Sequence, residues 1–386
     1  MKVEQVFSIV NSSAGEFLGE GSVIKEDLTN IVDIGNEIIS SDNVDNYVKK
    51  LVNHIGKVVF DNRVYGGNAP SVFMDSWEYG SILEKISSDI PNATENDTWN
   101  LVDGQSYDDD IFYQPKISAK FFNNKVTFEV PVSFTEKQVK ESFSSANQLN
   151  GFLSMIVNSV EKAMTIRIDG LVMKALNNMT AETLYDDLYL VDKVVYTNTG
   201  VKALNLLKMY TTKTGETLTA DKALTDGGFI RFATYTINLY RDRMTKISTL
   251  FNVGGKAKFT PSTDISTVLL SDFSSSIGVY CQADLQNDIY VTLPKHETVP
   301  YWQGSGVDYS FNEVSKIDVK TSGGHTVSTS GILGIMFDRE AVGVSNLDRR
   351  VTTNYNAKAE FYTNFYKLDA GYLNDLNENF IVFFMA

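Results

Sequence analysis

The sequence predicts an α+β protein, and three features of its patterning support that prediction. Residues 126–134 alternate apolar and polar side chains without error, which is typical of a strand with one buried face. Apolar residues from Leu153 to Ala175 recur at spacings of three and four, which predicts a long amphipathic helix. Strand-like segments dominate from Gly331 onward. The chain therefore combines a strand excursion, a long helix and a strand-rich return.

The N-terminal third predicts an arm, a helical segment and an exposed loop. Residues 3–29 are punctuated by glycine and serine without a sustained period, which indicates an extended arm. Apolar residues between Asn30 and Ile55 recur at helical spacing and predict one or two helices. Residues 57–65 are predicted to form a strand. The stretch from Ile86 to Pro115 contains acidic residues and no lysine or arginine, so it is expected to form an exposed loop tip.

The alternating segment 126–134 is predicted to be the returning strand of a long two-stranded excursion. Pro131 cannot donate a ladder hydrogen bond, so the strand is expected at a sheet edge. A two-stranded ribbon is marginally stable by itself, and a partner subunit is the natural candidate to cover it. Thr135 and Gln138 have the spacing of a capping box and predict a helix start immediately after the strand.

The long helix is expected to begin past a break at Asn150 and Gly151 and to sustain six to seven turns, roughly 35 Å. A second apolar stripe indicates that it is covered on two sides. Beyond it the sequence predicts a mixed α/β region and then returning strands. The expected helix is 220–244, and the expected strands are 267–270, 288–293, 316–320, 331–337, 358–368 and 380–385.

Composition limits the possible functions. The chain has 386 residues, 43% of them hydrophobic, and a net charge of −14 with no clustered cations. Tight nucleic-acid binding needs many lysine or arginine contacts with phosphates, so it is not expected. Cys281 is the single cysteine, which rules out an intrachain disulfide and favours a small buried side chain. No signal-peptide core or membrane-spanning run is present in the sequence, so folding in a reducing cytoplasm and no membrane contact are expected.

No catalytic, cofactor-binding or metal-ligating constellation is predicted. His54, His296 and His325 are isolated and lack metal-ligand spacing. Phosphate-binding and nucleophile-elbow motifs are missing from the sequence. The acidic loop lacks the order of a calcium-binding loop, so a solvated tip is favoured.

Several aromatic and arginine residues are candidates for subunit contacts. Aromatic residues between 355 and 372 could stack on sugars or bases, although strand packing is favoured. An adjacent arginine pair can serve an intersubunit salt bridge as readily as a ligand. The candidate interface residues are Trp77, Tyr79, Trp99, Phe128, Arg349 and Arg350.

The order of these elements resembles the major capsid proteins of tailed bacteriophages, the Hong Kong 97-like family. The resemblance lies in YQPKISAKFFNNKVTFEVPVSFTEKQVKESF, in NGFLSMIVNSVEKAMTIRIDGLVMKAL, and in a closing module with FDREAVG and ENFIVF. The resemblance implies five parts. They are an N-terminal arm and helix (1–55), an extended loop (56–134), a peripheral domain with a spine helix (135–184), an axial domain (185–333) and returning peripheral strands (334–386).

The resemblance also implies a structural protein that is not an enzyme and needs no cofactor. Hexamers and pentamers of one chain would form an icosahedral head around double-stranded DNA, assembled in the host cytoplasm and retained in the virion. The DNA would meet the shell through weak, non-specific contacts. The predicted arm is too short to include a scaffold, so a separate scaffolding protein is expected, together with a portal protein. The alternatives are an encapsulin-type compartment shell, a phage tail or baseplate protein, and a glycan-binding module.

Overall fold

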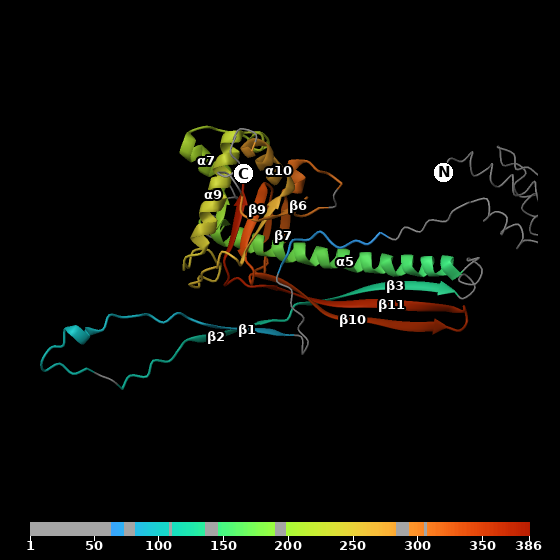
Figure 1. Ribbon diagram of the computed structural model, residues 1–386, viewed down its shortest axis with the longest axis horizontal. Coiled ribbons are helices and arrows are strands. Elements are labelled where there is room, and N and C mark those ends of the chain that lie inside the picture. Colours follow the sequence, from blue (N-terminus) through green and yellow to red (C-terminus); the bar gives the residue numbers. More distant parts are fainter. Residues whose placement is uncertain are drawn as a thin grey trace, which may run out of the picture. The chain divides into compact units, whose positions relative to one another are not determined.

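The computed structural model describes residues 63–72, 82–107, 110–135, 146–189, 198–282, 293–304 and 307–386 (Figure 1). The chain divides into two compact units. Residues 132–161 and 353–363 contribute to the smaller unit. Residues 65–131, 162–352 and 364–386 form the larger unit, which contains the main core.

A five-stranded sheet lies at the centre of the larger unit's core, in the order β4-β12-β9-β5-β6. Its strands are β4 (Ala203–Asn205), β5 (Ile265–Leu270), β6 (Glu297–Val299), β9 (Ile332–Asp338) and β12 (Phe380–Phe384). β12 runs antiparallel to β9 and parallel to β4, and β5 runs antiparallel to β9 and parallel to β6. Every residue of β9 and β12 is buried, because both faces of these strands are covered.

Several helices pack around this sheet, and two of them begin at side-chain caps. Asn205 caps α7 (Leu206–Thr214) by accepting from the Lys208 amide at 3.1 Å. Asp226 caps α9 (Gly227–Met244) by accepting from the Phe229 amide at 2.7 Å. The shorter helices and α10 have bounds α8 (Ala220–Ala223), α10 (Ser271–Gln282) and α11 (Phe311–Val314). The single helix predicted for 220–244 is wrong, because the Asp226 cap starts a new helix.

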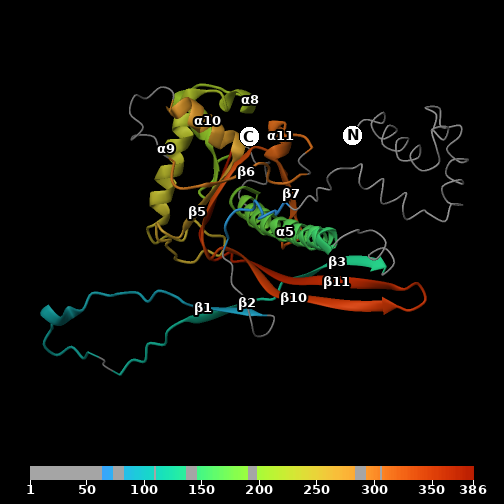
Figure 2. The ribbon, with the colours of Figure 1, turned by 45° about the vertical axis from the view of Figure 1, so that its right-hand side comes forward.

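The longest element is α5 (Ala146–Leu184), a helix of 39 residues (Figures 1 and 2). The predicted break at Asn150 and Gly151 is wrong, because the helix runs through both positions. Its C-terminal half is buried, with Leu176 and Met179 fully covered. A π-helical turn, Tyr185–Tyr189, follows. Asp187 holds this turn to the start of β4 by accepting from the amides of Lys202 and Ala203.

The alternating segment belongs to a three-stranded sheet of order β10-β11-β3. Its strands are β3 (Lys125–Thr135), β10 (Val342–Asn356) and β11 (Phe361–Asn374). β3 is an edge strand with a half-buried apolar face, as the alternation and Pro131 predicted. The expectation that β3 closes the excursion is wrong, because β1 (Leu83–Ser88) pairs instead with β2 (Ile117–Phe122). β7 (Ile317–Lys320) and β8 (Thr326–Thr329) form a further two-stranded sheet.

The remaining secondary-structure predictions have mixed outcomes. The strands expected near 267–270, 316–320, 331–337 and 380–385 are confirmed as β5, β7, β9 and β12 with small shifts at their ends, and the strand expected at 358–368 is confirmed as β11, which begins three residues later and ends six residues later. The helices predicted for 30–55, the strand predicted for 288–293 and the helix after Thr135 fall on residues outside those described. Residues 63–65 of the strand predicted for 57–65 are not in a strand, and the rest lies outside the described residues.

We predict that Gly331→Ala lowers the free energy of unfolding by at least about 2 kcal/mol. Gly331 has a φ of +90°, and an added Cβ would overlap the backbone carbonyl of Met385 beside β12. Gly278→Ala is the matched control, because Gly278 lies in α10 with open space around it, so a gain of about 0.5–1 kcal/mol is expected. Urea unfolding of both variants measures the difference, and equal stabilities would contradict the prediction.

Candidate assembly surfaces

The β1–β2 hairpin is a two-stranded ribbon of the larger unit that is not part of either larger sheet. Its register runs from Leu83 opposite Phe122 to Ser88 opposite Ile117. Among the described strands, β1 and β2 pair only with each other. Because side chains alternate along each strand, the ribbon presents two chemically different faces.

One face of the hairpin is largely apolar and exposed, and it also carries Glu84 opposite Phe121 and Ser88 opposite Ile117. The side chains of Ile86, Ile117 and Phe121 on this face are 66%, 66% and 62% exposed. Ala119, opposite Ile86 in the register, is also exposed. Contiguous exposed apolar surface on a sheet is characteristic of an interaction site. This face is defined here as the outer face of the hairpin.

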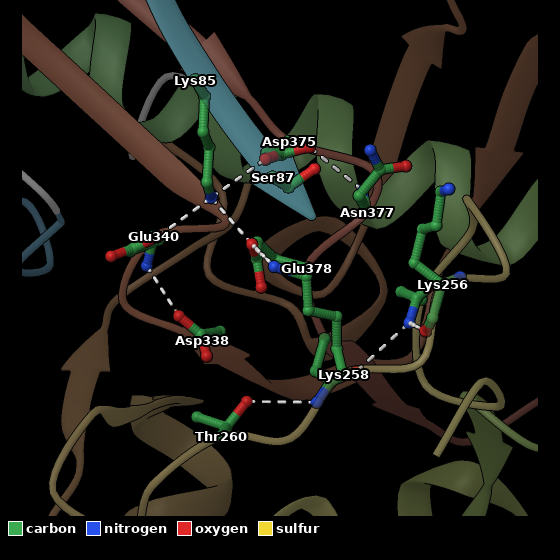
Figure 3. Close-up of polar contacts among 12 residues, drawn as sticks. Lys85, Ser87, Lys256, Lys258, Thr260, Asp338, Glu340, Asp375, Asn377 and Glu378 are labelled. Carbon is green, nitrogen blue, oxygen red and sulfur yellow. Dashed lines mark hydrogen bonds and ion pairs between the residues drawn. The ribbon is translucent and has the colours of Figure 1, made fainter. Parts of the chain in front are cut away.

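The other face carries two lysines that lie directly opposite one another. Lys85 of β1 pairs in register with Lys120 of β2, and like charges at such positions repel. Asp375 offsets this repulsion, because each of its two carboxylate oxygens accepts from one lysine Nζ, both at 3.0 Å. Figure 3 shows the Lys85 side chain reaching from β1 toward Asp375. One carboxylate therefore joins both strands of the hairpin.

Two further acidic residues complete this arrangement (Figure 3). Glu378 accepts from Lys85 Nζ at 2.7 Å and from Lys258 Nζ at 2.8 Å, both through the same oxygen. Glu340 lies 3.0 Å from Lys85 Nζ. The side chains of Asp375 and Glu378 are only 3% and 5% exposed, whereas Glu340 is 62% exposed. We call the six charged residues the hairpin-base cluster: Lys85, Lys120, Lys258, Glu340, Asp375 and Glu378.

The acidic members of the cluster lie in turns of the rest of the larger unit, which we call the body. Asp375 and Glu378 lie in the turn between β11 and β12, where the Asp375 amide donates to the Ala341 carbonyl at 2.8 Å. Asp375 Oδ1 also accepts from the Asn377 amide at 3.1 Å. Glu340 lies in the turn between β9 and β10, and its amide donates to Asp338 at 2.9 Å. The hydrogen bonds of these turns therefore position the acidic residues independently of the lysines.

Burial and pairing act in opposite directions on these groups. Burial raises the pKa of Asp375, but the charges of Lys85 and Lys120 outweigh it, so the pKa of this carboxyl lies below its usual value. Burial likewise lowers the pKa of Lys85, but its bond to Glu378 and the charge of Asp375 raise the pKa above the ordinary value. The neighbouring Asp338 has no such lysine, and burial raises its pKa. Both Asp375 and Lys85 are therefore charged at neutral pH.

Beyond this base, the residues between the two strands are exposed. A further ion pair joins Asp89 to Lys256 of the body at 2.9 Å. The acidic residues Glu95, Asp103 and Asp110 are exposed, as predicted for a loop tip. Large apolar side chains are also exposed there: Trp99, Leu101, Val102, Tyr107, Ile111, Phe112 and Tyr113. The segment therefore combines negative charge with uncovered aromatic surface.

The predicted interface residues are scattered over the structure. Trp99 is 93% exposed in the hairpin segment, whereas Phe128 is half-buried on β3 and packs against the core. Arg349 is exposed on β10. Arg350 is paired within its own chain, with Asp348 at 3.0 Å and with Asp369. Trp77 and Tyr79 lie outside the described residues.

Sequence reasoning missed the hairpin-base cluster. Lys85 and Asp375 are far apart in the sequence, and each occurs in a segment with ordinary surface-like composition. In the structure Leu83, Lys85 and Ser87 share the half-buried face of β1, but the segment LEKISS does not show this by itself. A lysine flanked at two-residue spacing by half-buried positions is consistent with a covered charge, but its partner cannot be read from the sequence.

Cavities and metal-binding groups give no stronger candidate. A cavity of about 440 Å³ lies beside α5 and includes Tyr65, whose hydroxyl donates to Asp169 at 3.0 Å. A second, of about 330 Å³, lies at the hairpin-base cluster. The described residues include no group of histidine, cysteine and acidic side chains suited to a metal ion. No helix in the described part is long and apolar enough to span a membrane.

The chain is similar to phage capsid proteins. The model of the Phi29-like phage major capsid protein family matches residues 8–384. A capsid structure of Staphylococcus phage Andhra has 9% identity and a TM-score of 0.48, covering 86% of both chains. A capsid structure of cyanophage P-SCSP1u has 13% identity and a TM-score of 0.44, covering 87% of this chain and 94% of that one. No curated protein matches the sequence.

We predict that Lys85→Met lowers the free energy of unfolding by about 3 kcal/mol, because it removes one partner from two nearly buried carboxylates. Lys116→Met is the matched control, since this exposed lysine lies just before β2 and outside the cluster, and a change within about 0.5 kcal/mol is expected. Urea unfolding at pH 7 measures both values. Equal losses in the two variants would show that the hairpin-base cluster does not contribute to the free energy of unfolding.

We predict that the stability difference between wild type and Asp375→Asn depends on pH. The pKa of Asp375 is lower in the folded chain than in the unfolded chain, so its contribution is present above the unfolded pKa, about 4, and is lost as pH falls through the folded value. At pH 7 the variant should be less stable by about 2 kcal/mol. Below about pH 4 the gap should shrink as the wild-type carboxyl is protonated. A gap that stays constant from pH 7 to pH 3 in urea titrations would contradict this.

Proposed function

The chain belongs to the Phi29-like phage major capsid protein family, and we propose that copies of it build an icosahedral head shell in which the outer face of the β1–β2 hairpin docks on a neighbouring subunit. As a member of this family it is a structural protein of the virion and not an enzyme. Copies of the chain associate with one another in the shell. The tail-protein, encapsulin and glycan-binding alternatives are not favoured.

We propose the Hong Kong 97-like fold for the subunit, divided as the sequence suggested. The 39-residue α5 fits a spine helix within the peripheral domain (135–184), and the β1–β2 hairpin fits an extended loop (56–134). An axial domain (185–333) would include α9 and β5. Because β9 and β12 pair with β5 and β4, we extend the axial sheet to strands of the last segment (334–386), which otherwise supplies returning strands. The N-terminal arm and helix (1–55) remain a proposal from sequence.

The uncovered outer face is the observation that supports docking most directly. Ile86, Ile117 and Phe121 are each more than 60% exposed on one side of a ribbon that has no third strand among the described residues. Burying such side chains stabilises an interface by about 25 cal/mol per Å². A second copy of the chain is the partner that a shell supplies at every position.

The other partners follow from the charge and from the family resemblance. A net charge of −14 does not favour tight binding to DNA, so we propose that packaged double-stranded DNA meets the shell through weak, non-specific contacts. We further propose a separate scaffolding protein during assembly, a portal protein at one vertex, and capsomers that are hexamers and pentamers.

We predict that Phe121→Ser abolishes regular shells while leaving a folded subunit, because it removes a large apolar side chain from the docking face without touching the core. Phe121→Leu is the matched control, since it keeps an apolar side chain at the same position. Each protein is expressed with its genomic neighbours and examined by negative-stain electron microscopy and light scattering. Regular shells from Phe121→Ser would refute docking through this face, and only small rings from wild type would refute the shell itself.

A further inference from the structure

The two sides of the hairpin-base cluster come from different structural parts. The hairpin supplies Lys85 and Lys120, whereas the body supplies Asp375, Glu378 and Glu340. Lys258, on the segment between α9 and β5, is the one cation of the cluster that the body itself contributes. Swinging the hairpin away would therefore leave two nearly buried carboxylates with a single lysine. An uncompensated buried charge is strongly unfavourable, so the body attracts the hairpin base.

Other contacts at this base are few among the described residues. Phe122, the last residue of β2, is buried and anchors one end of the ribbon. Just after it, the Asn124 carbonyl accepts from the Tyr372 amide at 3.2 Å. These contacts hold the Phe122 end of the ribbon in place, but they do not prevent the rest of the ribbon from rotating about that end. Away from Phe122, the described polar contacts that join the hairpin to the body are the ion pairs of Lys85, Lys120 and Asp89.

The geometry of the ion pairs restricts that pivot. Asp375 contacts both strands, with one oxygen on Lys85 and the other on Lys120, each at 3.0 Å. Lys85 simultaneously contacts carboxylates from two different turns, Glu340 at 3.0 Å and Glu378 at 2.7 Å (Figure 3). Bonds to both strands and to two turns cannot all be kept if the ribbon rotates about Phe122.

We propose that the hairpin-base cluster is an electrostatic latch that fixes the direction of the β1–β2 hairpin in the free subunit, so that the outer face is aimed before any second copy arrives. The latch acts from the face opposite the docking face, so a neighbouring subunit can bind without breaking it. Preorganisation of this kind lowers the entropy lost on association. The role in association rests on the proposed function, whereas the fixed direction is a property of the single subunit.

Distance measurements between two nitroxide labels in the unassembled subunit test the latch. One label replaces the exposed Glu84 on β1 and the other replaces the exposed Asp221 on α8, in a Cys281→Ser background. The variants are the double change Lys85→Met with Lys120→Met, and Asp375→Asn, which opens the same cluster from the body side. Lys116→Met is the matched control, because it removes a hairpin lysine outside the cluster. Circular dichroism establishes that each subunit is folded.

Wild type and Lys116→Met should give one narrow distance distribution of equal width, and the two latch variants should each broaden it at least twofold. A latch variant as narrow as wild type, or a wild type as broad as the variants, would overturn the proposal. If the double variant fails to fold, Asp375→Asn and the single change Lys120→Met, at a side chain 37% exposed, decide the question. A narrow wild-type distribution in subunits that never form shells would keep the latch and reject the proposed function.

Discussion

A two-stranded ribbon has two faces, and among the described residues of this subunit only one of them is held by side chains of the same chain. On the opposite face, which carries Lys85 and Lys120, Asp375 forms an ion pair with each lysine and offsets their repulsion. The outer face remains apolar and uncovered. This asymmetry leaves the hairpin held on one side and exposed on the other among the described residues, and we propose that a second copy of the chain covers the exposed side. In the proposed shell, covering this exposed apolar face is what stabilises the association of neighbouring subunits.

The body is built to hold the acidic side of this contact in place. β9 and β12 are fully buried neighbours in the five-stranded sheet, and the turns at their ends present Glu340 and Glu378. Because these turns are attached to fully buried strands, they hold the two carboxylates in place where the ribbon meets the body. Nearly buried carboxylates are stabilising only when their partners are positioned well, which is why the turn hydrogen bonds matter as much as the charges.

Local patterning predicted the elements, but it could not predict the contacts that orient them. The alternation of 126–134 and Pro131 predicted an edge strand, and the helical spacing after Leu153 predicted most of α5. The pairing of β3 failed because alternation identifies a strand without identifying its neighbour. The Asp226 cap was missed because helical spacing continues across it. The hairpin-base cluster depends on charges distant in sequence, which no local period records.

The spacing of the latch along the chain has a consequence for synthesis. β2 leaves the ribosome about 250 residues before Asp375, which at about 5–20 residues per second is a delay of roughly 10–50 s. Until Asp375 emerges, Lys85 and Lys120 lack the carboxylate that offsets their repulsion. The direction of the apolar outer face is therefore not yet fixed. The acid-bearing turn and β12 emerge together, so the core and the hairpin's direction are completed in one late event. With the proposed latch, the outer face of a new chain is therefore aimed only once its own sheet has closed.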